Sequence, residues 1–209
     1  MLTAEKPANI EIGSKPLHVV VDMQQMFVEG TAWSSPSPIT VLPNIERLCS
    51  AFATSTVFMK FMVPASVDHA PRRWRTYYER WQELTLEIAH PSIQEIVGPL
   101  RRFLTSRNQF EKYTFSAFGS PQFKAYLVEA DIDTLIFSGV ETDMCVYASV
   151  VDAIDRGFQV LVVEDAVTSS DIDAHHATLR HLLPRLPEFV GTITTEAAVD
   201  IASSLACHG

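Results

Sequence analysis

The sequence predicts a three-layer α/β fold, in which a doubly wound, mostly parallel six-stranded sheet lies between two layers of helices. Short, continuous apolar runs recur along the chain, as expected for strands buried on both faces of a parallel sheet. Segments with helical spacing of apolar residues separate these runs, which favours repeated strand–helix–strand units. The 209 residues contain no internal repeat and no Pro/Gly/Ser-rich linker. This length fits one domain over residues 1–209, since domains average about 150 residues.

The first predicted strand is the apolar run at residues 17–21. The other strands are expected at residues 56–61, 110–113 (a polar strand), 134–137, 159–163 and 189–192. Helices are expected at residues 43–54, 121–130, 143–156, 173–183 and 195–205. Pro43 would stand in the first turn of the first helix, where a missing N–H is tolerated. Val146, Val150 and Ile154 lie four residues apart in the third helix, and Gly157 is the expected stop.

One segment departs from this alternation. Residues 62–92 form an excursion, and its stretch 71–81 is dense in arginine and aromatic residues. We expect it to contain a helix and to serve as a lid or an oligomer contact rather than as core.

The composition excludes several classes of protein. The formal net charge is −9, which argues against nucleic-acid binding because phosphate contact needs a basic surface. No run approaches the roughly 20 apolar residues of a membrane span, and the first sixteen residues lack the apolar stretch of a secretory signal. Three cysteines without a CxxC spacing indicate neither a disulfide framework nor a zinc site, so we expect a cytoplasmic protein.

Ligands of such sheets bind beyond the carboxyl ends of the strands. The polar groups expected there are Asp22, residues 139–145, and the pair Glu164 and Asp165. The chain has no GxGxxG after its first strand, no GxxxxGK[ST] loop and no GxSxG elbow, which removes three common α/β functions and leaves no cofactor to expect.

Cys145 is the candidate nucleophile. If Thr142 is the N-cap, Cys145 lies in the first helical turn, where free N–H groups and the macrodipole favour a thiolate. The alternative is a small buried hydrophobe. Cys49 and Cys207 are interpreted as structural or incidental. None of the seven histidines is expected beside Cys145, whereas Asp22 is; its alternative role is a helix cap or a loop carboxylate.

Three motifs now resemble a known family. Val20-Val21-Asp22-Met23-Gln24 with Phe27 resembles the opening motif of the isochorismatase-like cysteine hydrolase superfamily. Residues 138–146, Ser-Gly-Val-Glu-Thr-Asp-Met-Cys-Val, resemble its nucleophile motif, and residues 111–118 resemble the segment that holds its lysine. The likeness continues through residues 152–153, 157 and 165–167, and spans residues 17–176.

The resemblance implies a Rossmann-like sheet and a catalytic triad of Asp22, Lys112 and Cys145. Asp22 would take the thiol proton and pass it to the leaving nitrogen, while Lys112 holds Asp22 and the thiolate in place. A cis peptide is implied between Val140 and Glu141, with the N–H groups of Glu141 and Cys145 forming the oxyanion hole. The alternatives are a surface position for Lys112 and a solvated Glu141 side chain. A homodimer or larger homo-oligomer is also implied.

Two features bear on the reaction. Asp68 and His69 are adjacent, unlike the Asp-x-His spacing of metal-dependent nicotinamidases, so we expect no metal. The cysteine favours hydrolysis of the C–N bond of a small amide, carbamoyl or ureido compound. The alternatives are an isochorismatase-type or nicotinamidase-type hydrolase, or a non-catalytic binding or assembly member of the same fold.

The substrate pocket is the least defined expectation. Its candidate side chains are Phe27, Trp74, Arg75, Trp81 and Tyr113. Arg72, Arg73 or Arg75 could bind a substrate carboxylate. The alternative is that the arginine-aromatic segment is a solvated helix or a subunit contact.

Overall fold

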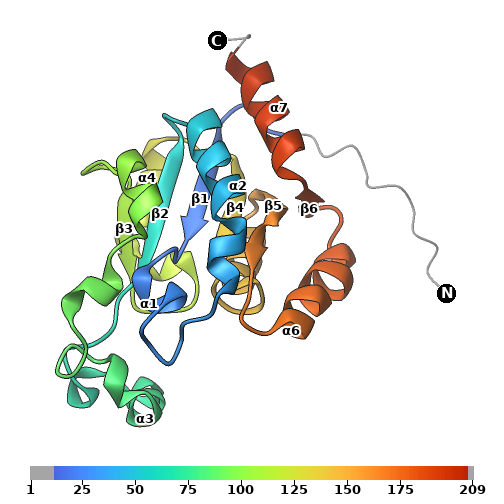
Figure 1. Cartoon of the computed structure of the whole chain (residues 1–209). Coiled ribbons are helices and arrows are strands. Elements are labelled where there is room, and N and C mark those ends of the chain that lie inside the picture. Colours follow the sequence, from blue (N-terminus) through green and yellow to red (C-terminus); the bar gives the residue numbers. More distant parts are fainter. Residues whose placement is uncertain (1–11, 207–209) are drawn as a thin grey trace.

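The computed structural model describes residues 12–206 and contains, within them, a six-stranded sheet of order β3-β2-β1-β4-β5-β6 (Figure 1). Every strand pair is parallel, which confirms the predicted doubly wound α/β fold. The strands are β1 (Pro16–Val21), β2 (Thr56–Phe61), β3 (Gln109–Lys112), β4 (Thr134–Val140), β5 (Gln159–Thr168) and β6 (Val190–Ile193).

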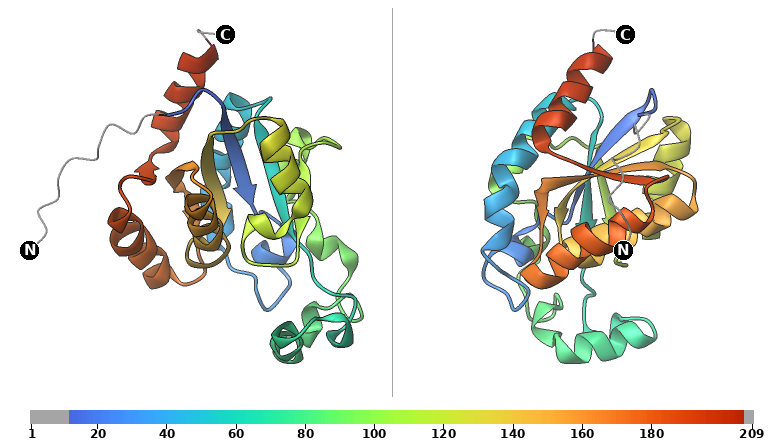
Figure 2. Two further views of the ribbon diagram at one scale, coloured as in Figure 1. Left: turned by 180° about the vertical axis from the view of Figure 1, so that it is seen from behind. Right: turned by 90° about the vertical axis from the view of Figure 1, so that its right-hand side faces the viewer.

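Helices cover both faces of the sheet. The α-helices are α1 (Gln25–Val28), α2 (Ser37–Ala51), α3 (Arg73–Arg80), α4 (Pro121–Glu129), α5 (Tyr147–Asp155), α6 (Ile172–Ala177) and α7 (Thr195–Ala206). Helices α2 and α7 lie on one side of the sheet, and the helices of residues 121–185 lie on the other (Figure 2). Short 3-10 helices occur at Val67–His69, Gln82–Leu84, Pro91–Gln94, Gly98–Phe103, Ala117–Gly119 and Leu183–Arg185, and π-helical turns at Thr142–Val146 and Thr178–Leu182.

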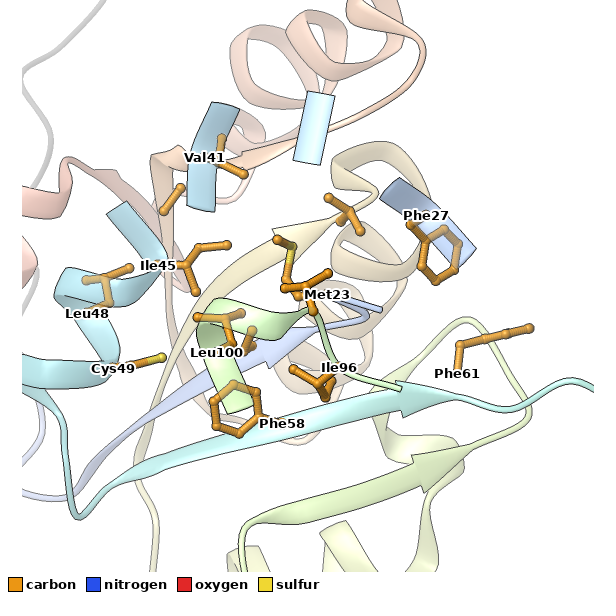
Figure 3. Close-up of a cluster of buried hydrophobic side chains, with 14 of the residues drawn as sticks. Met23, Phe27, Val41, Ile45, Leu48, Cys49, Phe58, Phe61, Ile96 and Leu100 are labelled. Atoms are coloured by element: carbon orange, nitrogen blue, oxygen red, sulfur yellow. The ribbon is translucent and has the colours of Figure 1, made fainter. Parts of the chain in front are cut away.

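Two hydrophobic clusters join these layers. Along β1, Val20 faces the cluster beneath α2, which includes Ile45 and Leu48 (Figure 3). Val19 and Val21 face the cluster beneath α4 and α5. The alternation of side chains along a strand therefore explains why β1 is apolar at successive positions and buried on both faces.

Two predicted helices differ from the structure. Helix α2 begins at Ser37 rather than at Pro43, so the proline of its first turn is Pro38, and Pro43 lies inside the helix. Pro43 is exposed, so its ring lies on the solvent side of the helix, and the missing N–H removes one hydrogen bond from the helix. The predicted helix at residues 173–183 is a succession of α, π and 3-10 turns.

The excursion lies at the carboxyl ends of the strands, on the same side of the sheet as α1. Gln24, which follows β1 and is fully buried, joins it to the sheet. Its amide donates to the carbonyls of Phe61 (3.0 Å) and Gln94 (2.8 Å), and its Oε1 accepts from the Phe61 N–H (2.7 Å). The segment after β1 is thereby linked to the residues that flank both ends of the excursion.

The remaining expectations about the whole molecule stay predictions. None of the described helices is long and apolar enough to cross a membrane. Cys207 lies outside the described residues. The single-domain organisation over residues 1–209, the cytoplasmic location and the homo-oligomer are carried by the sequence alone.

Candidate functional site

Asp22, Lys112 and Cys145 lie together at the carboxyl ends of the strands. Asp22 follows β1, Lys112 is the last residue of β3, and Cys145 lies in the π-helical turn after β4. Strands β1 and β4 are neighbours, yet their following helices lie on opposite faces, so the site occupies the switch point where ligands of open α/β sheets bind. Lys112 reaches Asp22 past the end of β2, where its Nζ lies 4.8 Å from the ring centroid of Phe61.

Asp22 and Lys112 form a buried ion pair. The Lys112 Nζ lies 2.7 Å from Asp22 Oδ2, and both side chains are fully buried. The ammonium also donates to the carbonyl of Thr114 at 3.1 Å. Within residues 12–206, Asp22 Oδ1 has no hydrogen-bond partner of ordinary geometry. The carboxylate is therefore held by one oxygen and keeps the other free.

Burial and charge act in opposite directions on this pair. Burial raises the pKa of Asp22, and the neighbouring Lys112 partly offsets that rise. Burial alone would lower the pKa of Lys112, but the ion pair and hydrogen bond with Asp22 raise it above its ordinary value. The raised pKa of Lys112 favours its charged form, and the Asp22 carboxylate has more affinity for a proton than a solvated aspartate.

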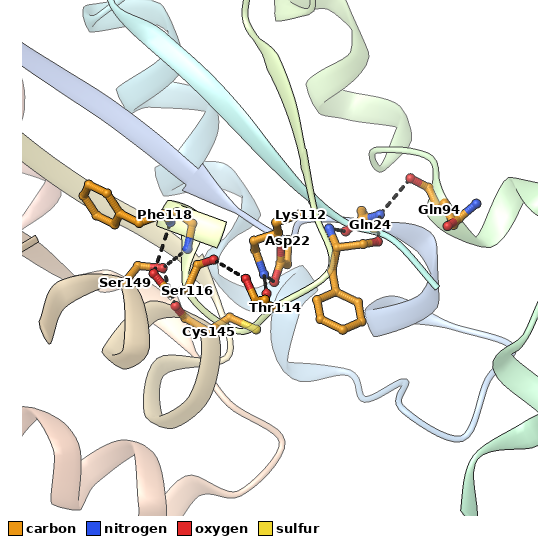
Figure 4. A network of polar contacts seen from close by, with 11 residues as sticks. Asp22, Gln24, Gln94, Lys112, Thr114, Ser116, Phe118, Cys145 and Ser149 are labelled. Carbon is orange, nitrogen blue, oxygen red and sulfur yellow. Dashed lines mark hydrogen bonds and ion pairs between the residues drawn. The ribbon is translucent and has the colours of Figure 1, made fainter. Parts of the chain in front are cut away.

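Cys145 is directed toward this pair (Figure 4). Burial raises the pKa of the Cys145 thiol, Lys112 lowers it and Asp22 raises it. Burial therefore favours the neutral thiol and opposes the thiolate that the helix N-terminus predicts. The thiolate stays a prediction, and a base close to the sulfur would favour the reaction by taking up the thiol proton.

The turn that carries Cys145 differs from the predicted one. Glu141 is the N-cap, and Cys145 is the fourth residue of the π-helical turn. The Thr142 hydroxyl does not cap the helix but bonds to the His175 Nδ1 at 2.9 Å. Ser149 Oγ donates to the carbonyl of Cys145 (2.6 Å) and accepts from the Ala117 N–H (2.9 Å). These contacts position the thiol, and neither His175 nor Ser149 was identified from the sequence, because both act through the fold.

The backbone before this turn is tightly constrained. The Val140–Glu141 peptide is cis. Gly139 has φ +107°, and a Cβ built there would overlap the carbonyl oxygen of Val21. Asp22 itself has φ +52°, a left-handed conformation that aspartate adopts more readily than most residues. Close approach of β1 and β4 at this level thus requires glycine.

A cavity of about 300 Å³ opens beside Cys145. Six aromatic side chains line it, and we call them the aromatic wall: Phe27, Trp33, Phe61, Tyr77, Trp81 and Phe115. The other lining residues are Ala32, Ser34, Glu141, Met144, Cys145 and Ser170. Trp33 is central to the wall, with ring centroids of Phe27, Phe61, Tyr77 and Trp81 at 6.0, 5.9, 5.8 and 6.3 Å.

Of the expected pocket residues, Phe27 and Trp81 line this cavity, and Trp74, Arg75 and Tyr113 do not. Trp74 packs behind the wall against Phe115, with centroids 5.1 Å apart. Arg75 pairs with Asp68, so its guanidinium is already matched by a carboxylate. Tyr113 follows the last residue of the edge strand β3 and is 59% exposed. Arg72 and Arg73 are also exposed and outside the cavity.

Other predicted polar groups have structural partners. Asp165 does not reach the cavity; its Oδ1 accepts from the N–H and the hydroxyl of Thr195 at the start of α7. Glu164 is exposed. Asp68 pairs with Arg75, and His69 Nδ1 bonds to Ser66 Oγ at 2.8 Å. No group of three histidine, cysteine or acidic side chains that could hold a metal ion occurs in the described part of the chain.

Comparison with known proteins shows which family this chain resembles. Residues 16–197 match the isochorismatase domain model. Maleamate amidohydrolase from Pseudomonas putida is 36% identical over 177 residues, 81% of this chain and 80% of that protein. Nicotinamidase 3 from Arabidopsis thaliana is 24% identical over 165 residues, 78% of each chain.

Solved structures show the same fold. A cysteine hydrolase from Pseudomonas syringae pv. phaseolicola superposes with a TM-score of 0.78 at 22% identity, covering 96% of this chain and 97% of that one. The match to the domain model covers residues 16–197. The strand order of the sheet and the site at its switch point are consistent with that match. The chain belongs to the isochorismatase family of hydrolases.

Proposed function

We propose that the protein hydrolyses the C–N bond of a small amide, carbamoyl or ureido compound, with Cys145 as the nucleophile and a thioester acyl-enzyme as the intermediate. The observation that carries this proposal is the buried Asp22–Lys112 ion pair, 2.7 Å long, beside a cysteine that lines an aromatic cavity. The similarity to an amidohydrolase and a nicotinamidase supports the amide class.

In the first half of the reaction, Cys145 Sγ attacks the substrate carbonyl carbon as Asp22 removes the thiol proton. The free Oδ1 of Asp22 is available for this proton while Oδ2 stays bound to Lys112. The raised pKa of Asp22 makes it a better base than a solvated aspartate. The carbonyl oxygen becomes an oxyanion, which the N–H groups of Glu141 and Cys145 would stabilise.

In the second half, the carboxyl of Asp22 returns its proton to the leaving nitrogen, the C–N bond breaks, and an amine or ammonia leaves. Asp22 then removes a proton from water, which attacks the thioester carbonyl. The C–S bond breaks, the acid product leaves, and the sulfur regains its proton. Lys112 stays charged throughout and positions the Asp22 carboxylate. These steps need no cofactor.

Ammonia release tests this proposal. The parent protein and Cys145→Ala are incubated with a panel of small primary amides, carbamoyl amino acids and ureido compounds. We expect release by the parent from at least one class and a loss of about 10³-fold or more in Cys145→Ala. Cys49→Ala, which truncates a cysteine buried in the cluster beneath α2, is the matched control and should keep the activity.

Two outcomes would replace the proposal. Equal activity of Cys145→Ala and the parent would exclude the cysteine mechanism. Absence of release from every class would favour the non-catalytic member of the fold or a substrate cleaved at a C–O bond, as in an isochorismatase-type reaction.

A further inference from the structure

The charges around the cavity are unevenly distributed. Glu141 is the one charged side chain that lines it among the residues the structure describes. Its two carboxylate oxygens accept from the N–H and the hydroxyl of Ser170, at 2.9 and 3.0 Å. Each oxygen thus accepts one hydrogen bond and keeps a lone pair for a ligand. The carboxylate is oriented, partly buried and four residues from the nucleophile.

Among residues 12–206, no lysine or arginine side chain lines this cavity to bind a carboxylate. The Lys112 charge is matched by Asp22, and Arg75 is matched by Asp68. Arg80 stacks on the Trp81 ring, 4.7 Å from its centroid, but it is exposed and does not line the cavity. An amide that carries a carboxylate would therefore enter a site whose one unmatched charge is negative.

The aromatic wall favours the opposite charge. Ring faces carry negative electrostatic potential and attract compact cations, most strongly when water is excluded. The six rings line a cavity of about 300 Å³, which admits one substituted ring or an equally small group. A box of aromatic rings with one carboxylate is the arrangement that binds quaternary ammonium and N-alkylpyridinium groups.

We propose that the cavity takes an amide whose non-reacting part is a compact cation of the quaternary ammonium or N-alkylpyridinium class, and that it excludes amides that carry a carboxylate. This inference rests on the proposed amidohydrolase function, since it assigns the substrate class of the same site. The amide would face Cys145, and the cation would lie against the wall and Glu141.

Three probes of matched shape test this assignment. They are the 3-carbamoyl-1-methylpyridinium cation, its neutral isostere 3-methylbenzamide, and the anion 3-carbamoylbenzoate. Dissociation constants are measured by calorimetry on Cys145→Ser, which prevents turnover, so differences in amide reactivity do not enter. Burial raises the pKa of Glu141. The titrations are therefore made at about pH 8, well above the ordinary glutamate range, so that the carboxylate is charged.

We expect the cation to bind about tenfold or more tightly than the neutral isostere, and the anion about tenfold or more weakly. Glu141→Gln in the same background should reduce the preference for the cation about fivefold or more. Glu164→Gln removes the same charge from an exposed position outside the cavity and should leave the preference unchanged. Quenching of tryptophan fluorescence in the parent gives the same ranking if Cys145→Ser does not fold.

Equal or tighter binding of the neutral or anionic probe, no binding of any probe, or a preference that Glu141→Gln does not reduce would overturn the inference. The proposed function fails in a different way. If Cys145→Ala releases ammonia as fast as the parent, the cysteine mechanism is wrong, whatever the ranking of the probes.

Discussion

The reacting end of the site and the aromatic wall are built in different ways. Asp22, Lys112 and Cys145 lie at or just after the ends of three strands that are separated by long stretches of sequence, and all three are buried. The wall comes mainly from loops and from α3, a helix with one buried residue, Tyr78. The sheet therefore positions the groups proposed for the chemistry, while exposed, locally folded segments shape the space that selects the substrate. Changes in the first region should affect the rate of reaction, and changes in the second should affect binding.

The largest effect on this comparison is expected from Lys112→Met, which keeps the length of the side chain and removes its charge. It leaves the Asp22 carboxylate buried without a partner, so the free energy of unfolding should fall by about 3–5 kcal/mol. The value of kcat/KM should fall by about 10²-fold or more. Lys112 lowers the pKa of Asp22, so its removal should move the acidic limb of the pH profile to higher pH.

Two further variants separate charge from structure. Lys124→Met removes an exposed lysine of α4 and should change neither quantity. The double variant Asp22→Asn with Lys112→Met removes both charges and should recover much of the stability but none of the activity. Parent-like activity in Lys112→Met would show that the ion pair does not serve the reaction.

The next largest effect is expected from a change in the backbone near the end of β4. Gly139→Ala would place a Cβ against the Val21 carbonyl in a left-handed conformation, and we expect a loss of about 3 kcal/mol or more in urea unfolding. Gly30→Ala is the matched control, because φ is +75° there but no atom lies within 4 Å of the added Cβ. It should cost about 1 kcal/mol. Equal losses would show that strand approach at Gly139 imposes no constraint.

A smaller effect is expected in the wall. Trp81→Leu removes a ring that lines the cavity and contacts Trp33, so KM should rise about five- to tenfold with little change in kcat. Tyr113→Leu, an aromatic truncation at an exposed position outside the cavity, should leave KM unchanged. Steady-state kinetics with one substrate compare them, and a larger effect of Tyr113→Leu would restore the pocket expected from the sequence.

The smallest effect is expected in the pH dependence of Cys145 alkylation. Because burial raises the pKa of Cys145, alkylation of this residue by iodoacetamide should increase only above about pH 8.5, the ordinary range of a free thiol. Mass spectrometry of the peptide that contains Cys145 follows it separately from Cys49, whose pKa burial raises to about 12. Half-maximal alkylation of Cys145 well below that range would indicate a preformed thiolate, as the helix N-terminus alone suggests.

The predictability of the fold follows from local patterns. Strand β2 lies at the predicted residues 56–61, since a short, mostly apolar run of strand length is consistent with a buried parallel strand. Helix α2 was misplaced by six residues because two prolines, Pro38 and Pro43, could each stand in a first turn. The 3-10 turns around the excursion depend on contacts such as those of Gln24, which no local pattern reveals.

Some parts of the site were predicted and others were not, again because local sequence patterns do not reveal tertiary contacts. Strand ends bring Asp22, Lys112 and Cys145 together, and motif order along the chain was enough to select them. Trp33 and Phe115 come from loops whose course depends on tertiary packing, so their place in the wall was missed. The density of aromatics at residues 71–81 signalled a pocket segment, but it did not distinguish Tyr77, which faces the cavity, from Trp74, which packs behind it.

Covalent capture of the intermediate tests the central claim most directly. The parent protein is mixed with an amide that it hydrolyses, the reaction is quenched in acid within the first turnovers, and the chain is analysed by mass spectrometry. The proposed mechanism predicts a mass increase equal to the acyl group, located on Cys145 and absent from Cys145→Ala. An acyl group on another residue, or turnover by Cys145→Ala at the parent rate, would contradict it.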